Sequence, residues 1–480
     1  MIQFLLNNTL ITENDIDPNL TVLNYLRTRL RRTGTKEGCA SGDCGACSVT
    51  LGKAVEGKMQ YETVNSCLTL VSTLQGKQLI TVEDLKQGNQ LHPAQQAMVA
   101  CHGSQCGFCT PGFVMSLFSL QKNRKDWDRH QAEIALAGNL CRCTGYRAIM
   151  DAARQVCSQP CHDKFDQTAA NVVQRLEALI QPEMQALSGN GHRCFLPKTP
   201  EQLAQIYLEH PNARLVAGGT DLSLHITQQY KPLPILITLE HIEALKVCSE
   251  ADEHYILGAG ASLNQVSEFL AARIPGVSEM LQRFASLQIR HQGTLGGNIA
   301  NASPIGDASP MLLALNASLQ LQRGDRQRNV ALDEFFTGYR QTVLQEGEFI
   351  RAIKVPKVTV SPDFVAWKVS KRLDDDISAV FAAFNIACHH GVVSDARIAF
   401  GGMAATPKRA SACEQTLMGQ PLNAVTVAQA CAALALDFQP LSDFRASADY
   451  RLQVARNLLR RYYHRSSGDL TITEVSRYVS

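Results

Sequence analysis

The sequence predicts an α+β protein built from several domains, and three observations lead to this fold class. The chain has 480 residues, which is too long for one ordinary hydrophobic core. Nine of its 16 cysteines cluster between residues 39 and 143, whereas the other seven are scattered. Glycine-rich turns separate strand-like and helix-like stretches in the remainder of the chain. We therefore expect a cysteine-dependent N-terminal part followed by larger α+β domains.

The composition excludes several classes of protein. Hydrophobic residues make up 45% and charged residues 19%, which is typical of a soluble globular chain. The net charge of +2 gives no support for a nucleic-acid partner, and the basic stretch 27–32 is interpreted as a solvated helix face. Residues 1–15 lack a signal-peptide pattern, and no apolar run is long enough to cross a bilayer. We expect a cytoplasmic protein without membrane contact, in which structural disulfides are rare.

The first cysteine set predicts an iron–sulfur site. Its spacing, C-x4-C-x2-C with a later fourth cysteine, is typical of a plant-type [2Fe–2S] cluster. Glycines at 38, 42 and 45 allow the loop to curl and its N–H groups to point at the sulfurs. A structural zinc ion is the alternative, although zinc sites usually pair two C-x2-C knuckles and this set has one. The predicted ligands are Cys39, Cys44, Cys47 and Cys67.

The residues that flank this set predict a ferredoxin-like domain over 1–83. Segments 1–8 and 48–55 have the pattern of strands, and segment 21–30 has the pattern of a helix between them. This is the element order of a β-grasp ferredoxin.

A second cysteine set predicts another cluster, carried by a small helical bundle over 84–157. A C-x2-C pair and a C-x-C pair on separate segments can close around one site. A helix should begin with Thr110 as its cap and Pro111 in its first turn, and another should end at Gly138. Cys101 lies outside both pairs and is interpreted as a bystander. The predicted ligands are Cys106, Cys109, Cys141 and Cys143.

The segments "HGSQCGFCTPGFVMSL" and "GNLCRCTGYR" closely resemble the second iron–sulfur domain of the molybdenum hydroxylase family. This family includes xanthine dehydrogenase and aldehyde oxidase, and the first motif, "GTKEGCASGDCGACSV", agrees with it. The resemblance implies that the loop 41–43 faces a flavin, although many relatives carry Glu-Gly-Gly at these positions.

The next part of the chain predicts a linker and then a flavin domain. Residues 158–192 are expected to form the linker, with one helical stretch over 169–180. In the domain 193–362, a strand at 215–217 leads into the Gly218-Gly219 turn, whose exposed amides suit a pyrophosphate. The run 290–310, rich in Gly, Ala, Ser and Asn, is suited to line a groove for a dinucleotide.

The resemblance extends to this domain, which is similar to vanillyl-alcohol-oxidase-type FAD domains. A competing Rossmann fingerprint at Gly258 and Gly260 is rejected, because Leu263 stands where a third glycine is needed. The resemblance assigns FAD binding to Leu215, Val216, Ala217, Gly218, Gly219, Thr220, Asp221, Leu222, Thr294, Gly297, Asn298, Asn301 and Asp307.

Residues 363–480 resemble the family's C-terminal α+β flavoprotein domain, with an expected three-stranded sheet and helices. Lys368 and Asp375 match positions near the isoalloxazine ring, with a charged turn as the alternative for the acidic stretch. Tyr339 matches an aromatic residue near the nicotinamide, with packing beside Phe335 and Phe336 as its alternative.

The resemblance implies that this chain holds no catalytic residues for hydroxylation. The expected cofactors are two 2Fe-2S clusters and FAD, with NAD as acceptor and molybdopterin on a partner chain. We expect the small subunit of a two-chain xanthine dehydrogenase, in a heterotetramer of two small and two large subunits, relaying electrons while hypoxanthine and xanthine are oxidised to urate. The alternatives are the equivalent subunit of an aldehyde or other N-heterocycle hydroxylase, and a stand-alone iron–sulfur flavoprotein.

Overall fold

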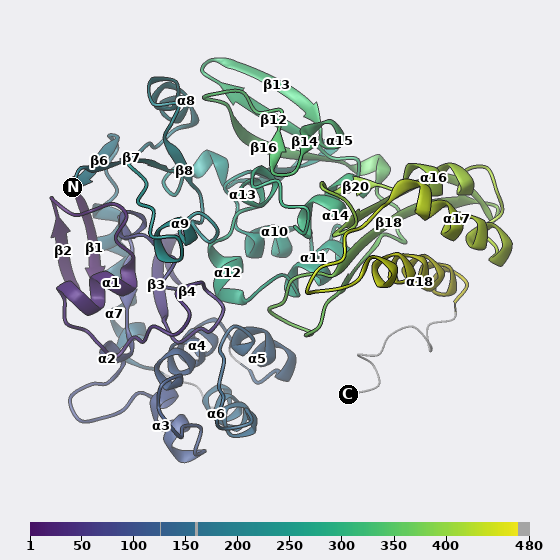
Figure 1. Ribbon diagram of the computed structural model, residues 1–480. Coiled ribbons are helices and arrows are strands. Elements are labelled where there is room, and N and C mark those ends of the chain that lie inside the picture. Colours follow the sequence, from purple (N-terminus) through teal and green to yellow (C-terminus); the bar gives the residue numbers. More distant parts are fainter. Residues whose placement is uncertain (125, 159–161, 469–480) are drawn as a thin grey trace. The chain divides into compact units, whose positions relative to one another are not determined.

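The computed structural model describes residues 1–124, 126–158 and 162–468, which form two compact units (Figure 1). Unit 1 contains Met1–Ala244 and Ala285–Gly293, and unit 2 contains Leu245–Phe284 and the chain from Thr294 onward. The predicted flavin domain is therefore divided between the units. Residues 159–161 of the predicted linker and 469–480 of the predicted C-terminal domain lie outside the described residues.

Unit 1 begins with a mixed five-stranded sheet in the order β2-β1-β5-β3-β4, which confirms the predicted β-grasp domain. β1 pairs antiparallel with β2 and parallel with β5, and β3 pairs antiparallel with β4 and β5. The helix expected over 21–30 forms as a short α-helix that continues into a π-helix, and it buries Tyr25 edge-on against Phe4. The elements are β1 (Ile2–Leu6), β2 (Thr9–Glu13), α1 (Val22–Asn24), η1 (Tyr25–Arg29), β3 (Ser48–Val55), β4 (Lys58–Asn65), η2 (Val71–Leu74) and β5 (Gln78–Ile80).

The helical bundle predicted next is present: its four helices α3 to α6, together with the short α2 before them, share one hydrophobic core. The expectation that Thr110 caps α4 is wrong, because Cys109 holds the cap position and Thr110 is the first helical residue. Pro111 occupies the first turn as expected, where its missing N–H has no intrahelical partner to lose. The elements are α2 (Val82–Leu85), α3 (Pro93–Ala100), α4 (Thr110–Asn123), α5 (Arg129–Leu136) and α6 (Arg147–Cys157).

The segment expected to be a linker contains more regular structure than its sequence suggested. Its helix α7 begins at Lys164 instead of 169, because the Asp163 carboxylate accepts hydrogen bonds from Phe165 N and Asp166 N. The segment also contains β6, which forms the edge of a second sheet in the order β6-β7-β9-β8. The elements are α7 (Lys164–Ala178), β6 (Gln185–Gly189), β7 (His192–Leu196), α8 (Pro200–Glu209), β8 (Arg214–Val216), α9 (Leu224–Thr227), β9 (Ile235–Thr238) and α12 (Leu287–Gln292).

Unit 2 contains an antiparallel sheet in the order β10-β11-β16-β12-β13 and a separate small hairpin. Helices α10, α11, α13 and α14 contribute buried side chains to the same core as this sheet. The elements are β10 (Cys248–Glu250), β11 (His254–Gly258), α10 (Leu263–Leu270), α11 (Pro275–Gln282), α13 (Leu295–Ala300), α14 (Ala308–Ala314), β12 (Ser318–Arg323), β13 (Arg326–Ala331), α15 (Leu332–Phe335), β14 (Phe336–Gly338), β15 (Gln341–Thr342), β16 (Phe349–Pro356) and η4 (Lys357–Thr359), with η3 (Glu243–Leu245) at the start.

The C-terminal sheet has four strands where three were expected, in the order β17-β18-β19-β20. The additional strand has two residues, too few for a hydrophobic alternation that would predict it. The long hairpin β18–β19 shares a core with α16, α17 and α18 (Figure 1, green to yellow). The elements are β17 (Val365–Val369), β18 (Val380–His389), β19 (Val392–Gly401), β20 (Lys408–Arg409), α16 (Ser411–Leu417), α17 (Ala424–Asp437) and α18 (Ala448–Ser466).

One buried carboxylate joins α7 to the helical bundle. Asp163 Oδ1 accepts from Lys122 Nζ at 2.6 Å, and Asp163 Oδ2 accepts from His92 Nε2 at 2.7 Å. The His92 Nδ1 accepts from Ala94 N, which leaves the proton on Nε2 for Asp163. Burial opposes ionisation of Asp163, but the hydrogen bonds from His92 and Lys122 outweigh it and hold its pKa well below the usual value.

Replacing this carboxylate should destabilise unit 1. We expect Asp163→Asn to lower the free energy of unfolding by about 2–4 kcal/mol near neutral pH, since it leaves a buried ammonium poorly compensated. The lowered pKa means that the contribution exists above the ordinary carboxyl pKa of 3.8 and is lost as the pH falls below it. Urea unfolding at about pH 7 and about pH 3 tests both points. Asp166→Asn is the control, because Asp166 is 40% exposed and should contribute under about 1 kcal/mol. Equal effects of both variants would contradict the assignment.

Candidate functional site

The first cysteine set lies on a turned loop and a nearby strand end. Cys39, Cys44 and Cys47 occupy the loop before β3, and Cys67 follows β4. Positive φ at Gly42 (+84°) and Gly45 (+66°) lets the loop double back, as the glycine pattern predicted.

The four thiols of this set form two hydrogen-bonded pairs. Cys44 donates to Cys39, and this bond is the largest cause that lowers the pKa of Cys39, to about 4. Cys67 donates to Cys47, which lowers the pKa of Cys47 and raises that of Cys67. The Ser41 N–H also points at the Cys39 sulfur, at 3.4 Å. A bound metal would displace the thiol protons, because a thiol that coordinates a metal ion is deprotonated.

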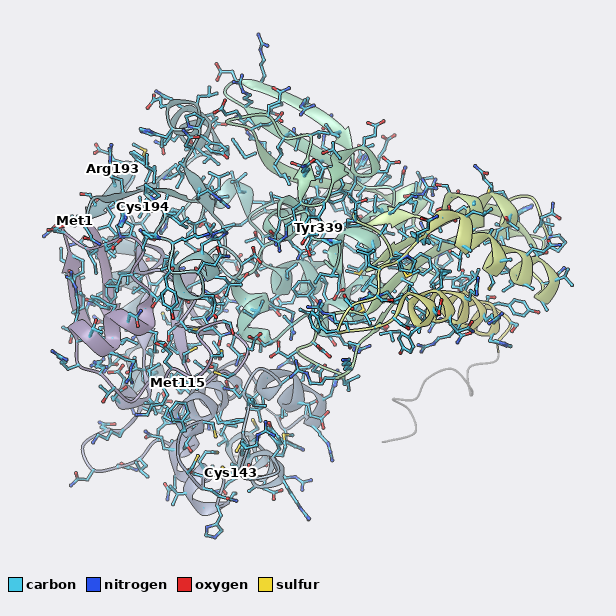
Figure 2. All side chains as sticks on the ribbon, viewed as in Figure 1. Met1, Met115, Cys143, Arg193, Cys194 and Tyr339 are labelled. Carbon is cyan, nitrogen blue, oxygen red and sulfur yellow. The ribbon has the colours of Figure 1, made fainter. Side chains whose placement is uncertain are left out.

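The second set is assembled at the ends of bundle helices in the same pairwise manner. Cys109 caps α4, and Cys106 lies in the loop before it, while Cys141 and Cys143 lie between α5 and α6. The Cys109 thiol is hydrogen-bonded to Cys141, and burial together with this bond raises the pKa of Cys109 to about 12. Cys143, exposed beside α6 (Figure 2), is hydrogen-bonded to Cys106.

Paired thiols fit a two-iron cluster better than a single metal ion. Each iron of a [2Fe–2S] cluster takes two cysteine thiolates, whereas zinc in a structural site takes all four ligands at one point. Over the described ranges, no group of three or more His, Cys, Asp or Glu side chains is arranged to hold one metal ion. The donor sets of both sites therefore match the chemistry of 2Fe-2S clusters.

Cys101 does not join either set. It caps the C-terminus of α3, and its thiol donates to Gln155 Oε1 at 3.2 Å. Cys101 therefore lies outside both sets, but it is half-buried where a buried bystander was expected.

The two ligand loops touch through their backbones. Leu140 N, directly before a ligand of the second set, donates to the Cys44 carbonyl oxygen at 2.9 Å. A Cβ atom at Gly45 would overlap the Gly138 carbonyl oxygen, and a Cβ at Gly112 would overlap the Gly45 carbonyl oxygen. Only glycine permits this approach at Gly45 and Gly112, whereas a Cβ at Gly138 would overlap the side chains of Ser286 and Gln288.

The predicted pyrophosphate turn lies against the first ligand set within unit 1. Gly219 has φ +73°, and a Cβ at Gly218 would overlap the Gln292 carbonyl oxygen, so both positions require glycine. Ser223 Oγ donates to the Leu68 carbonyl oxygen at 2.7 Å, one residue after a cysteine ligand. Further along, Gln228 Nε2 donates to the Cys39 carbonyl oxygen at 3.0 Å. The strip 215–222 is thus held by the loops that carry the first cysteines.

The remaining predicted flavin residues lie in unit 2. The Thr294 hydroxyl accepts from Gly297 N at 3.1 Å and begins α13, and Asn301 ends that helix. Asn298 Oδ1 is buried and has no hydrogen-bond partner in the described part of the chain. An unpaired buried acceptor is unfavourable unless a ligand supplies a donor, which fits a cofactor site here.

Asp307 and Lys368 are brought into direct contact. Lys368 Nζ donates to Asp307 Oδ2 at 2.8 Å, and the two side chains are 3% and 5% exposed. Ser378 Oγ donates to the other carboxylate oxygen at 2.6 Å. The two predicted flavin residues therefore neutralise each other and are held rigidly in unit 2.

Tyr339 occupies an exposed turn, and Asp375 is half-buried at a bend. Tyr339 follows β14 and is 63% exposed (Figure 2), whereas Phe335 and Phe336 contact each other edge-on. The described contacts thus include no packing of the Tyr339 ring on either phenylalanine. Asp375 has φ +49°, and its carbonyl oxygen accepts from Arg372.

The rejected Rossmann fingerprint has a packing explanation. Gly258 ends β11, and a Cβ there would overlap the Leu245 carbonyl oxygen. A Cβ at Gly260 would lie 3.2 Å from the same oxygen. These glycines allow close backbone packing beside Leu245.

Two buried amides that matter for the site carry no sequence signal. Asn139 and Gln288 lie about 150 residues apart in the chain yet hydrogen-bond to each other at 3.0 Å, beside the loop contact described above. A single Asn or Gln that belongs to no motif gives no indication in the sequence that it takes part in a site.

Across the described ranges, every helix is too short or too polar to cross a membrane.

Four family models match consecutive parts of the chain. The 2Fe-2S iron–sulfur cluster binding domain matches residues 7–72, and the [2Fe-2S] binding domain matches 81–154. The FAD binding domain in molybdopterin dehydrogenase matches 186–358, and the CO dehydrogenase flavoprotein C-terminal domain matches 365–466.

The chain is also similar to curated proteins and to a solved structure. Xanthine dehydrogenase of Drosophila subobscura is 34% identical over 478 residues, covering 88% of this chain and 36% of its own length. Aldehyde oxidase 2 of Macaca fascicularis is 30% identical over 490 residues, covering 90% and 36%. A carbon monoxide dehydrogenase chain from Hydrogenophaga pseudoflava aligns with a TM-score of 0.53 and 27% identity, covering 56% of this chain and 94% of that one.

The chain spans little more than a third of the length of these curated relatives. The matched parts follow one another along the chain as two iron–sulfur domains, a FAD domain and a C-terminal flavoprotein domain. With the paired thiols of both cysteine sets, these matches establish that the protein is an iron–sulfur and FAD chain of the molybdenum hydroxylase family.

Proposed function

We propose that this chain relays electrons from a molybdenum centre on a partner chain to NAD, as the small subunit of a xanthine dehydrogenase. When bound, two 2Fe-2S clusters and FAD supply the electron-carrying chemistry. The observation that carries the proposal is the direct contact, within unit 1, between the two ligand loops and between the first loop and the Gly218-Gly219 turn.

The cysteine pairs are proposed as the cluster ligands. In this role the backbone positions the thiols of the first set, because the positive φ angles at Gly42 and Gly45 let the loop that carries them double back. N–H groups such as that of Ser41 stabilise thiolate charge. The proposed ligands are Cys39, Cys44, Cys47, Cys67, Cys106, Cys109, Cys141 and Cys143.

Flavin binding is proposed for both predicted sets of residues. In unit 1 the strip 215–222 presents backbone amides at a turn that a side chain would block. In unit 2 the buried Asn298 Oδ1 has no hydrogen-bond donor among the described residues, and a bound flavin would supply one. The Asp307–Lys368 pair holds the backbone before α14. Thr294, Gly297 and Asn301 belong to this second set.

A molybdenum-binding large subunit is the proposed partner, in a heterotetramer of two small and two large subunits. The curated relatives extend far beyond the matched part, and the similar carbon monoxide dehydrogenase is described as a form that lacks the Mo-pyranopterin moiety of its molybdenum cofactor. Around the exposed Cys106 and Cys143, large apolar side chains are also exposed, among them Phe108, Leu140 and Tyr146. Covering this surface with a partner would bury apolar area and exclude water from the second ligand set.

Hypoxanthine and xanthine, oxidised to urate in the cytoplasm, are the proposed substrates of the assembled enzyme. The similarity to xanthine dehydrogenases favours them, and the similarity to an aldehyde oxidase keeps an aldehyde or N-heterocycle substrate as the second candidate. Copurifying the chain with its native partner and assaying xanthine with NAD, against an aldehyde with NAD, separates the two. A chain that copurifies with no molybdenum protein would instead favour the stand-alone flavoprotein.

The isolated chain should hold four irons and four acid-labile sulfides, and Cys47→Ser should remove half of each. The serine hydroxyl is a poor ligand for iron, and the second set lies on separate segments. Iron and sulfide analysis after anaerobic purification measures this. Cys194→Ser is the control, because Cys194 is fully buried in β7 outside both sets. Zinc in place of iron, or loss of all iron from Cys47→Ser with folding retained, would contradict the two-cluster assignment.

Gly219→Val should release FAD while both clusters remain. The positive φ at Gly219 costs a branched residue about 1–2 kcal/mol, and the new side chain would stand where amides meet phosphate. Absorbance of the purified variant gives flavin and iron content together. Gly191→Val provides a matched control, since Gly191 also has positive φ (+78°) but has open space around it. Stoichiometric FAD in Gly219→Val would count against the pyrophosphate turn.

Tyr339→Ala should raise the KM for NAD of the assembled enzyme about three- to tenfold, the value of one aromatic stacking contact. Flavin reduction by substrate should change little, because Tyr339 is 63% exposed and is not one of the predicted cluster ligands. Steady-state NAD kinetics and anaerobic flavin bleaching separate the two half-reactions. Tyr450→Ala, also an exposed tyrosine of unit 2, should leave both unchanged. Equal losses in both half-reactions would exclude a role in NAD binding.

A further inference from the structure

We propose that Asn139 and Gln288 form a buried amide bridge that sets the separation of the two cluster-ligand loops. Both are then positioning residues for electron transfer between the two sites, although neither is a ligand. This inference rests on the proposed function, because it takes the two cysteine sets as cluster ligands.

Asn139 connects the two loops through its side chain. Its Oδ1 accepts from Ser116 Oγ at 2.7 Å and from Gln288 Nε2 at 3.0 Å, and its Nδ2 donates to the Gly45 carbonyl oxygen at 3.1 Å. Two donors on one side and an acceptor on the other determine the orientation of the amide. Asn139 lies two residues before Cys141, and Gly45 directly follows Cys44. One side chain therefore joins a residue near each ligand set.

Gln288 supports this bridge from the segment 285–293 of the flavin region. The side chain is fully buried on α12, and its Nε2 makes the bond to Asn139. Its Oε1 is buried without a partner, packed where Gly138 has no side chain. An unpaired buried oxygen is unfavourable, and methionine would fill the same space without it. The presence of an amide at position 288 is therefore explained by its Nε2 group, which holds the Asn139 side chain in place.

The bridge affects the distance between the two cysteine loops and not the binding of iron by the cysteines. Without the Nε2 donor, the Asn139 amide keeps its bond from Ser116 Oγ but is held less firmly against the Gly45 carbonyl oxygen, which also accepts from Ser48 N and Ser48 Oγ. Links between the loops that do not involve Gln288 are the Leu140 N bond to the Cys44 carbonyl oxygen and the longer Asn139 Nδ2 bond to Ser48 Oγ at 3.4 Å. We expect the separation of the loops to change slightly while all eight cysteines still bind iron. Electron tunnelling and magnetic dipolar coupling both fall steeply with separation.

The test compares Gln288→Met and Gln288→Glu in the full chain, purified anaerobically with its iron and FAD. The first variant removes both polar atoms, and the second keeps the shape but sets an acceptor against Asn139 Oδ1. Gln121→Met is the matched control: the Gln121 Nε2 donates to the Val156 carbonyl oxygen at 3.1 Å, and its Oε1 is also buried and unpartnered. Iron and sulfide are measured per chain. The splitting of low-temperature EPR signals from the dithionite-reduced chain reports the coupling between clusters.

We expect both Gln288 variants to keep four irons and to show a shifted or lost splitting, with the control unchanged. Four irons with an unchanged splitting would overturn the proposal. Iron loss from both Gln288 variants alone would also overturn it, since Gln288 would then serve assembly of the ligand sets. A wild-type chain that holds no iron would refute the proposed function, and this inference with it.

Discussion

The contact of three glycines at one point is the constraint on which the rest of unit 1 depends. Gly45 belongs to the first ligand loop, Gly112 to the first turn of α4, and Gly138 to the second ligand loop. A methyl group at any of them would overlap backbone or side-chain oxygen. The approach allows the Leu140 N–H to reach the Cys44 carbonyl oxygen. This backbone hydrogen bond brings the two cysteine sets together, and the side-chain amides of Asn139 and Gln288 add to it.

The cysteine pairs follow from this backbone arrangement. Three of the four pairs draw their members from different parts of the fold, such as Cys47 before β3 with Cys67 after β4, or Cys109 at the cap of α4 with Cys141 after α5. These three pairs exist only when those elements are packed. Metal binding and folding are coupled in such a site, because thiolates gathered in one place repel each other until a metal compensates their charge.

Each unit contains a network of buried charged side chains. In unit 1, Asp163 is ionised between Lys122 and His92 and attaches α7 to the bundle. In unit 2, Lys368 and Asp307 form a buried pair completed by Ser378. Both are networks in which every charged group has a partner, a condition for burying charge without a large loss of stability. In unit 2 this makes the residues assigned to flavin part of the core, which holds the loop before α14 in one conformation.

The sequence by itself determined the two iron–sulfur folds and the flavin class and predicted the cysteine ligands, because spacing and glycine content are local properties of the chain. Thr110 and the start of α7 were misplaced by local reasoning, since Cys109 and Asp163 hold the cap positions. Only the tertiary structure decided which thiols pair, that Asp307 contacts Lys368, and that Gln288 reaches Asn139. These contacts join residues tens to hundreds of positions apart. Their geometry depends on how whole elements pack, which no local pattern encodes.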